Sequence, residues 1–531
     1  MKRTIIQYLL VGIVCCLSSC YDDDSTLGSN YVSDIEIAGL ADQSVVSYSQ
    51  NFVNVQPTVT TDYPEDQLEY AWYIYADNTP EQENGFRKDR IATTKDLNYE
   101  VNLPSGLYHL VFEVTSLTNN FSKTATMNLS VSTAFSKGFY ILKETADGNT
   151  DIDLWNEGIL SEDILAKKLG APMNGAPRNL SLVYTGEFIN PELNRTARGN
   201  LVHIFTEENE YKGFESESLT EVFNNETLFY AGNMDNEEPY IIFRAPNHTV
   251  YFSNTGIRTA ATVFSGTNYN SGRLGFPADE HGASKFIIPV SYGQEMVYWS
   301  NSEHALRDVN FNFQPSSLVT SADGSTYPDD LECISAGANI TGDVYSPTVV
   351  AYFLCEQPST GDRYLLLLDG GFTFTGVQIK QIIKLDPSLH IARDKIVAIN
   401  RRTATYIYSI SEDNKLYAYS WVSNDEREFP LPGIPAGEDI TYLTNQYFYL
   451  SEVYGYDTSF NFDDLIVGTQ TGNTYKLYFY SASKDMNGGR PIADPSRVIT
   501  GTGQVKAVRF LVSMSVRGSD HYSDPIYPLT D

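Results

Sequence analysis

Residues 138–144 read GFYILKE and residues 150–155 read TDIDLW, with a polar turn centred near Gly148 between them. Apolar and aromatic runs on both sides of a turn rich in Asp, Gly and Asn predict an antiparallel β-hairpin. Six further pairs of this kind follow, with turns centred near residues 193, 246, 302, 359, 413 and 472. A hairpin that recurs every 45 to 59 residues is typical of the blades of a β-propeller.

The spacing of the hairpins also predicts the number of blades. Residues 134–531 divided among seven hairpins give about 57 residues per unit, which agrees with the later intervals. The run VKAVRFLVSM (505–514) is left over after the seventh hairpin. Such a strand could complete the first blade and close the ring, which would remove the exposed edges of an open array. We therefore favour seven blades, with an assembly of β-sandwiches as the alternative.

The chain before this region shows a different pattern. From Ile35 to about Thr133, short strands alternate with period two, among them LEYAWYIY (68–75) and GLYHLVFEV (106–114). About 100 residues with a central Trp and a late Tyr suit an Ig-like β-sandwich, with Trp72 and Tyr108 in its core. The expected fold class is thus all-β, with a sandwich at 35–133 and a propeller at 134–531. One helix is predicted, over residues 161–169.

Composition excludes two classes of protein. The chain has 531 residues, 67 acidic against 36 basic side chains, and a net charge of −31. Nucleic-acid binding depends on Lys and Arg that displace counterions from phosphates, so this balance argues against it. Aromatic residues make up 13% of the chain, which is too many for a disordered protein.

The first nineteen residues have the features of a signal peptide. A basic start, Met1–Arg3, precedes an apolar stretch from Ile5 to Leu17, which is too short to span a membrane. It leads into LSSC (17–20), which resembles a bacterial lipobox. The resemblance implies cleavage before Cys20 and lipidation of that residue, so that acyl chains anchor the protein to the membrane. The alternative is an ordinary secretory peptide with incidental cysteines.

Residues 20–34 read as a flexible tether that begins with an acidic run. Asp22, Asp23 and Asp24 follow Cys20 almost directly. This arrangement resembles the surface-export signal of Bacteroidota lipoproteins and implies an outer-membrane location facing the outside of the cell. The alternative is a solvated run of charge.

A search for catalytic motifs predicts no enzyme. The sequence has no nucleophile elbow, zinc-protease motif, P-loop or dinucleotide fingerprint. Its seven histidines are scattered, with no pair four residues apart as a helical zinc site would need. Paired carboxylates such as Asp329–Asp330 and Asp463–Asp464 read as solvated turns, since a glycosidase needs a spatial separation that sequence does not show.

One segment is a candidate calcium site. Asp147, Asn149, Asp151 and Asp153 place oxygen ligands at alternate positions, as at the start of a calcium loop. Ile152 stands where an EF-hand loop needs Gly. The alternative is a hairpin turn whose Asp, Gly and Asn serve the turn itself. No other cofactor is predicted.

Aromatic residues and cysteines supply the remaining candidates. Tyr269, in the loop GTNYNSG, is a candidate ligand-binding aromatic, because aromatic faces with polar neighbours hold sugars and peptides. Trp155, Trp299 and Trp421 are expected mainly to pack within blades. Cys333 and Cys355 could form a disulfide outside the cell or remain as buried thiols.

Taken together, the lipobox, the acidic run, the sandwich and the segment SKGFYILKETADGNTDIDLWNEG (136–158) resemble the PKD-like family of Bacteroidota surface lipoproteins. The resemblance implies a non-enzymatic accessory component of a nutrient-uptake system, with a SusC-like transporter and a SusD-like lipoprotein as partners. Its ligand would be a glycan or a peptide. The alternatives are a propeller hydrolase or lyase that acts on extracellular polymers, and an adhesin.

Overall fold

The computed structural model describes residues 33–46, 52–76, 89–103, 106–191, 194–230, 237–245, 248–261, 271–277, 281–291, 295–309, 316–341, 348–370, 377–448, 461–481 and 488–512. The chain divides into two compact units, Met1–Val131 and Ser132–Asp531, two residues before the boundary expected at 133/134. In the described part of the chain, no helix combines the length and apolar character needed to cross a membrane.

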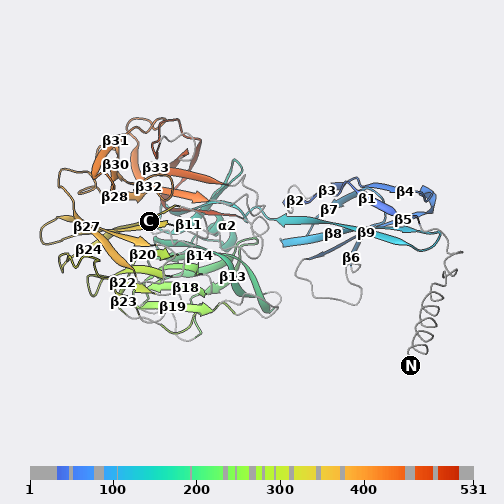
Figure 1. Ribbon diagram of the computed structural model, residues 1–531, viewed down its shortest axis with the longest axis horizontal. Coiled ribbons are helices and arrows are strands. Elements are labelled where there is room, and N and C mark those ends of the chain that lie inside the picture. Colours follow the sequence, from blue (N-terminus) through green and yellow to red (C-terminus); the bar gives the residue numbers. More distant parts are fainter. Residues whose placement is uncertain are drawn as a thin grey trace, which may run out of the picture. The chain divides into compact units, whose positions relative to one another are not determined.

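The first unit is a β-sandwich (Figure 1). Its larger sheet has the order β2 (Gln43–Val46), β9 (Ser122–Ser132), β8 (Gly106–Ser116), β5 (Leu68–Ala76), β6 (Asp89–Ala92). Two strand pairs accompany it: β1 (Ile35–Ala38) with β4 (Thr58–Thr61), and β3 (Phe52–Val55) with β7 (Leu97–Glu100). Residues of all three sheets form one buried cluster, in which Trp72 is inaccessible to solvent and Tyr108 is 9% exposed. Both residues therefore lie in the core, as predicted.

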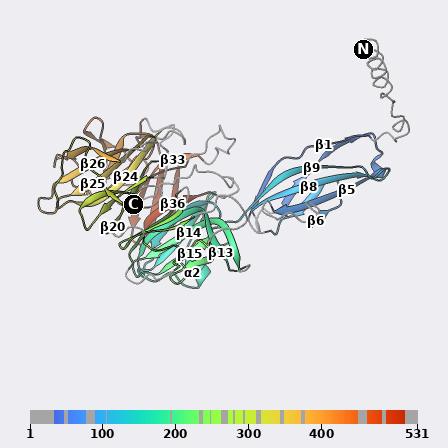
Figure 2. The same cartoon turned by 60° about the horizontal axis from the view of Figure 1, so that its bottom comes forward.

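The second unit consists of seven antiparallel sheets, which we number as blades 1 to 7 in chain order (Figures 1 and 2). Blade 1 has the order β12 (Ile159–Ser161), β11 (Thr150–Asn156), β10 (Gly138–Glu144), β36 (Gln504–Leu511). Blades 2 to 4 contain β13 (Pro177–Asn190), β14 (Arg195–Thr206), β15 (Tyr211–Glu215) and β16 (Thr220–Asn224); β17 (Pro239–Ala245), β18 (His248–Ser253) and β19 (Gly256–Ala261); and β20 (Ala283–Ser291), β21 (Glu295–Ser300), β22 (Ala305–Val309) and β23 (Ser317–Leu318).

Blades 5 to 7 complete the set. They contain β24 (Glu332–Thr341), β25 (Thr348–Glu356), β26 (Arg363–Gly370) and β27 (Gln378–Lys384); β28 (Ile396–Ile399), β29 (Tyr406–Ile410), β30 (Leu416–Ser420) and β31 (Asp425–Phe429); and β32 (Asp439–Phe448), β33 (Phe462–Thr471), β34 (Thr474–Ser481) and β35 (Arg497–Thr502). The all-β fold class, a sandwich followed by a seven-bladed propeller, is confirmed.

The innermost strands of the seven blades form a ring. β36 packs against β13, and the contacts continue through β17, β20, β24, β28 and β32 back to β36. β36 pairs antiparallel with β10, so that Gly138 faces Leu511 and Ile141 faces Val508. The C-terminal strand therefore completes the first blade, as the leftover run at 505–514 predicted, and closes the ring of packed inner strands.

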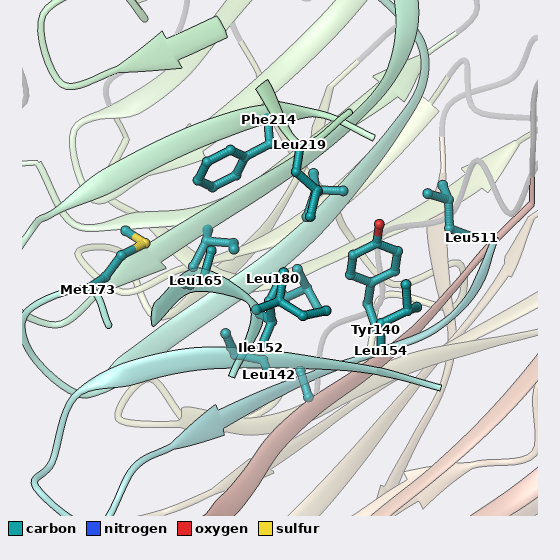
Figure 3. Packing of buried hydrophobic residues seen from close by; sticks show 14 of the residues in the cluster. Tyr140, Leu142, Ile152, Leu154, Leu165, Met173, Leu180, Phe214, Leu219 and Leu511 are labelled. Atoms are coloured by element: carbon teal, nitrogen blue, oxygen red, sulfur yellow. The ribbon is translucent and has the colours of Figure 1, made fainter. Parts of the chain in front are cut away.

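The buried core lies between neighbouring blades. One cluster combines side chains of blades 1 and 2, including Tyr140, Leu142, Leu180 and Phe214, with Leu511 from β36 (Figure 3). Alternate residues of each strand point to opposite faces, so every blade contributes one apolar face to each neighbour. This explains why the predicted strands read as nearly continuous apolar runs.

The predicted helix starts later than expected. Helix α2 spans Ile164–Leu169 and ends at Gly170, which has φ 89°. Residues 159–161 instead pair with β11 as the outer strand of blade 1. The carboxylate of Asp151 accepts hydrogen bonds from the backbone N–H groups of Leu165 and Ala166, at 2.8 and 3.1 Å. A side chain from the neighbouring strand therefore supplies acceptors for the first turn of α2.

Candidate functional site

The two ends of the ring carry different connections. One end, here the turn end, carries the hairpins between the second and third strands from the axis, which are two to six residues long, and the connections from the outer strands of blades 1, 2, 4, 5 and 6 to the next blade, which are 9 to 15 residues long. The other end, here the loop end, carries the connections between first and second strands and between third and fourth. Two of these are long: 13 residues separate β32 from β33, and 15 separate β34 from β35. Because binding residues concentrate on loops held by a rigid scaffold, the loop end is a candidate binding face.

A polar turn follows β28, the inner strand of blade 6, at the loop end. β28 has only four residues, and the chain turns at Asn400. The Asn400 side-chain oxygen accepts hydrogen bonds from the backbone N–H groups of Arg402 and Ala404, at 3.2 and 2.9 Å. Its amide donates to the hydroxyl of Tyr408 at 3.0 Å. Asn400 thus holds the turn together from inside, as Asx side chains do in tight turns.

Asparagines of the neighbouring blades hold the same turn from both sides. In blade 5, the Asn339 amide donates to the carbonyl oxygens of Asn400 and Ala404, at 2.8 and 3.1 Å. In blade 7, the Asn445 side-chain oxygen accepts a hydrogen bond from the backbone N–H of Arg401 at 2.6 Å. Both asparagines are buried, so these bonds replace water for groups that would otherwise be unsatisfied. Three blades are therefore joined at one turn.

The reading of Asp463–Asp464 as a solvated turn is wrong. Both residues lie in β33 and are buried, at 5% and 4% exposure. The Asp463 carboxylate accepts hydrogen bonds from the Asn445 amide at 3.0 Å and from the Thr403 hydroxyl. Burial raises the pKa of Asp463, and these hydrogen bonds oppose the rise. Asp463 therefore completes the polar cluster at the loop end.

Asp464 faces the other way, because successive residues of a strand point to opposite faces. Burial raises the pKa of its carboxyl to about 6, with Arg497 opposing the rise. The guanidinium of Arg497 lies over the ring of Trp155 at 4.2 Å, in the interface between blades 7 and 1. Two adjacent carboxyls on opposite faces of a sheet cannot serve one substrate as acid and base. The other pair, Asp329–Asp330, does lie in a turn.

The chemistry of the loop-end cluster suits binding. Arg401 is buried at 8% exposure, and the guanidinium of Arg402 lies over the Tyr447 ring at 5.5 Å. Thr403 is exposed beside them and bonds to the one carboxylate of the cluster. The cluster thus presents hydrogen-bond donors, positive charge and an aromatic ring, without a nucleophile paired to a base.

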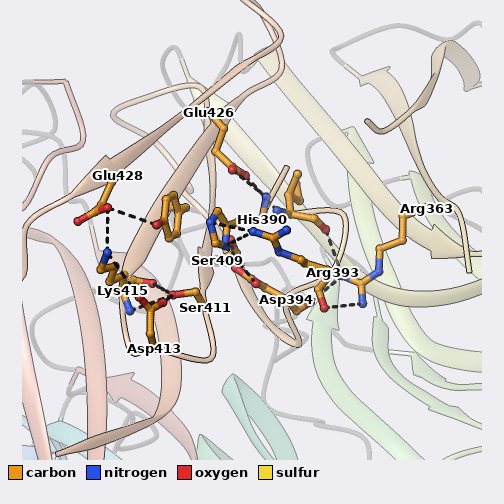
Figure 4. A network of polar contacts seen from close by, with 12 residues as sticks. Arg363, His390, Arg393, Asp394, Ser409, Ser411, Asp413, Lys415, Glu426 and Glu428 are labelled. Atoms are coloured by element: carbon orange, nitrogen blue, oxygen red, sulfur yellow. Dashed lines mark hydrogen bonds and ion pairs between the residues drawn. The ribbon is translucent and has the colours of Figure 1, made fainter. Parts of the chain in front are cut away.

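A second polar network lies at the turn end, between blades 5 and 6 (Figure 4). Ser409 donates a hydrogen bond to Asp394 at 2.7 Å, and Asp394 lies 3.5 Å from Nδ1 of His390. A catalytic triad needs His between Ser and Asp, whereas here Asp stands in the middle and Ser409 is buried. This order of residues does not activate the serine hydroxyl.

The same network organises the connection from β27 to β28. Glu426 accepts hydrogen bonds from the backbone N–H groups of His390 and Ile391, at 2.7 and 3.0 Å. Arg363 donates to the carbonyl oxygens of Ile391 and Asp394, at 3.1 and 2.6 Å. The His390 ring stacks on Tyr417 with 3.5 Å between centroids. These contacts give the network a structural role.

The four predicted calcium ligands have separate surroundings. Asp147 is exposed in the turn, and Asn149 accepts a hydrogen bond from the backbone N–H of Gly175 at 3.2 Å. Asp151 supports α2. Asp153 forms an ion pair with Lys143 at 2.6 Å and accepts a hydrogen bond from the Tyr475 hydroxyl at 2.7 Å.

The surroundings of Asp153 connect blades 1 and 7. Burial raises the pKa of Asp153 to about 6, and Lys143 opposes the rise. Nowhere in the described ranges do three or more His, Cys, Asp or Glu side chains form a group that could hold a metal ion. The structure thus gives Asp151 and Asp153 internal partners and does not bring the four residues around one point.

The other candidates have varied positions. Cys20, Asp22, Asp23, Asp24 and Tyr269 lie outside the described residues. Two residues after Tyr269, the Ser271 hydroxyl lies 2.7 Å from that of Tyr230, whose side chain is 59% exposed. Trp299 is fully buried and Trp421 is 9% exposed, whereas Trp155 is half-buried against Arg497. Cys333 and Cys355 face each other across β24 and β25.

Sequence reasoning missed the residues that build the loop-end cluster. Asn339, Asn400 and Asn445 belong to no motif, and their partners lie up to 65 residues away in the chain. One signal was present: an Asn within three residues of the end of an inner strand, in three successive blades. That signal is readable only once the blades have been counted.

Comparison with known proteins identifies one part of the chain. Residues 20–177 match the model of the PKD-like family. No curated protein matches the sequence. The structure is similar to a quinonprotein alcohol dehydrogenase-like protein from Bacteroides thetaiotaomicron, at 11% identity and a TM-score of 0.35, covering 88% of this chain and 96% of that one.

Two other Bacteroides structures are similar at the same level. A candidate 6-phosphogluconolactonase from Bacteroides fragilis has 12% identity and a TM-score of 0.37, covering 71% of this chain and 99% of that one. A DUF4784 family protein from Bacteroides caccae has 9% identity and a TM-score of 0.31, with coverages of 76% and 97%. The family match ends at Pro177, where β13 begins. The chain therefore carries a PKD-like segment that includes the sandwich, strands β10, β11 and β12 of blade 1, and helix α2.

Proposed function

We propose that this protein is a lipoprotein of the bacterial outer membrane, exposed on the cell surface, and a non-enzymatic binding component of a nutrient-uptake system. The observation that carries the proposal is the PKD-like match, which begins at Cys20, the residue that ends the lipobox-like LSSC. Cleavage before Cys20 would leave this residue as the lipid anchor, followed by the acidic run Asp22–Asp24.

The described polar clusters support binding over catalysis. Ser409 bonds to Asp394 instead of a histidine, and Asp463 and Asp464 point to opposite faces of β33. Enzymes that use carboxyl pairs or nucleophiles need these groups to converge on one reacting atom. The buried polar groups of the propeller instead bond to one another across blades.

The ligand is proposed to bind at the loop end of the propeller. There, the turn at Asn400 presents Arg402 and Thr403 beside Tyr447, and buried Asn339 and Asn445 hold the backbone below. A rigid polar turn of this kind costs little conformational entropy on binding. Glycans and extended peptides both present the hydroxyl, carbonyl or carboxylate groups that such donors recognise.

The partners are proposed to be a SusC-like transporter and a SusD-like lipoprotein. The tether and the sandwich would separate the propeller from the membrane along the chain. An acidic protein is not attracted to anionic headgroups, so it gains nothing from lying close to them. This arrangement would place the propeller where nutrients arrive before transport.

Two variants test the anchor and the export signal. Cys20→Ala should abolish attachment to the membrane and labelling by palmitate. A variant that is still labelled would overturn the lipobox assignment. Replacing Asp22, Asp23 and Asp24 with Ala should leave lipidation intact and remove accessibility to protease on whole cells, while unchanged accessibility would make the acidic run a simple tether.

The function itself is tested by affinity purification of the tagged lipoprotein from outer membranes in mild detergent. Recovery of a SusC-like and SusD-like pair supports the uptake complex, and the substrate of that complex then names the ligand class. Recovery of the protein alone, under conditions in which a known pair of this kind stays together, contradicts the proposed partnership. Arrays of glycans and peptides, with Arg402→Ala as the matched variant, then test whether the loop end binds either class.

A further inference from the structure

The two cysteines of the propeller lie opposite each other in blade 5. Cys333 on β24 and Cys355 on β25 are direct partners in the antiparallel register. Residues directly opposite in such a pair have Cα atoms about 4.5–5.5 Å apart and side chains on the same face of the sheet. This separation lies inside the range of about 4.4–6.8 Å that a disulfide requires. The backbone is therefore already arranged for a bond between the two sulfur atoms.

The surroundings of the two thiols favour a bond between them over a bond to other groups. Cys355 is fully buried and Cys333 is partly buried against the same apolar cluster. The Cys333 Sγ lies 3.5 Å from the carbonyl oxygen of Ser335, and Cys355 is its direct partner across the strand pair. Both cysteines are free thiols in the structure. Each thiol thus has the other as its nearest reactive neighbour.

The backbone beside Cys333 also allows a small adjustment. The register shifts between Cys333 and Ser335, so Ile334 is an extra residue in β24, and its side chain is 37% exposed. A β-bulge of this kind locally frees a strand from its ladder. Cys333, which is partly exposed, is therefore the more adaptable and more accessible member of the pair, whereas Cys355 is buried.

We infer that Cys333 and Cys355 form a reversible disulfide that fastens β24 to β25. The step is thiol–disulfide exchange with a disulfide-bearing oxidant, either a small molecule or an oxidoreductase. The Cys333 thiolate attacks a sulfur of the oxidant and displaces a thiol, and the Cys355 thiolate then displaces the second. Two thiols lose two protons and two electrons, one S–S bond forms, and the disulfide of the oxidant is reduced to two thiols.

The bond would stabilise blade 5, because it adds a covalent link between two of its strands. Cys333 and Cys355 are 22 positions apart, so the disulfide closes a loop that contains the whole connection between β24 and β25. β24 is the inner strand of blade 5 and packs against β20 and β28. Fastening it to β25 would restrict separation of these two strands within blade 5. The occurrence of the bond in the cell depends on the proposed export, whereas its chemistry does not.

The test uses the purified full-length chain, equilibrated with mixtures of reduced and oxidised glutathione, trapped with acid, and labelled with maleimide after denaturation. Peptide mapping then reads residues 333 and 355 separately. We expect a cross-linked peptide pair that has lost two hydrogens, and a midpoint of thermal unfolding about 5 °C above that of the reduced protein. The matched control, Cys333→Ala with Cys355→Ala, should show no difference between oxidised and reduced buffers.

Two results would overturn the inference. One is full maleimide labelling of both residues after oxidation, and the other is a stable glutathione adduct on either residue as the end product. Cys355→Ala alone keeps the test valid if the double variant folds poorly, because Cys333 should then accumulate the mixed disulfide that the wild-type chain resolves. These outcomes do not depend on lipidation, so failure here is separable from failure of the lipoprotein proposal.

Discussion

Removing the C-terminal strand tests the ring more directly than any point substitution. A stop after Thr502 deletes β36, while a stop after Val512 keeps the strand and deletes only residues 513–531, which makes it the matched control. The segment 503–512, which contains β36, contributes four apolar side chains that are at most 4% exposed: Val505, Val508, Leu511 and Val512. At about 1.5–3 kcal/mol for each, their burial accounts for roughly 6–12 kcal/mol.

Deletion also removes hydrogen-bond partners from neighbouring blades. The Tyr184 hydroxyl donates to the carbonyl oxygen of Phe510, and the Asn200 amide to that of Val512, both at 2.9 Å. Each buried donor left without its acceptor costs about 1–3 kcal/mol more. The total matches or exceeds the whole stability of a typical domain, about 5–15 kcal/mol. We therefore expect the truncated propeller to be unfolded while the sandwich stays folded.

The assay is urea denaturation followed by tryptophan fluorescence. The chain has four tryptophans, of which Trp72 belongs to the sandwich and Trp155, Trp299 and Trp421 to the propeller. A Trp72→Phe background therefore reports the propeller alone. The 502 truncation should lose the propeller transition, and a synthetic peptide of residues 503–512 should restore it. If the truncated chain keeps a transition with the midpoint of the 512 control, closure by β36 is not what holds the ring.

Three further predictions concern buried groups. Burial lowers the pKa of His203 to about 3 from 6.5, so the unfolded chain binds a proton that the folded chain does not. The free energy of unfolding should therefore fall by about 2 kcal/mol between pH 7 and 5. His203→Gln should reduce this pH dependence of the urea midpoint, and an unchanged slope would contradict the prediction. The pKa of Asp464 is raised to about 6 from 3.8, so ionisation of this carboxyl destabilises the folded state progressively between about pH 4 and 6 and to its full extent above pH 6. Asp464→Asn should match the wild type at pH 4 and be up to about 3 kcal/mol more stable at pH 8. A variant that is less stable at pH 8 would show instead that the ion pair with Arg497 is net favourable. Gly272 has φ +73°, and a Cβ there would lie 1.8 Å from the carbonyl oxygen of Glu187; Gly272→Ala should lower the thermal midpoint of the propeller, while Gly324→Ala, with φ +77° and open space around it, serves as the control for backbone strain alone.

The architecture was predictable because it depends on patterns that are local in sequence. Hairpins such as residues 138–155 combine short apolar runs with a polar turn, and both signals lie within twenty residues. The closing role of β36 followed from counting, since one strand was left over. In blades 2 and 3, however, the predicted turns near 193 and 246 join the first and second strands, while in the other blades they join the second and third. Because three successive strands in a blade are similarly apolar, the sequence does not show which two of them a predicted turn joins.

The candidate site was much less predictable, because its residues are brought together only by the ring. Asp463 looks like any other acidic residue, and its partners Thr403 and Asn445 stand 60 and 18 positions away. The cost of burying a carboxylate is offset only by donors from other blades, which no local pattern announces. The same holds for Asp153, whose partner Tyr475 is 322 positions away.

Closure by the last strand also determines when the first blade can be completed during synthesis. β10, β11 and β12 are complete once Ser161 has been made, but β36 does not begin until Gln504. At synthesis rates of about 5–20 residues per second, the inner edge of blade 1 waits for roughly 20–70 s. During this interval β10 presents an unpaired edge that other nascent chains can join. The protein is therefore most prone to aggregate before its last strand is in place, and a pause late in translation or export should increase its aggregation more than a pause of equal length early on.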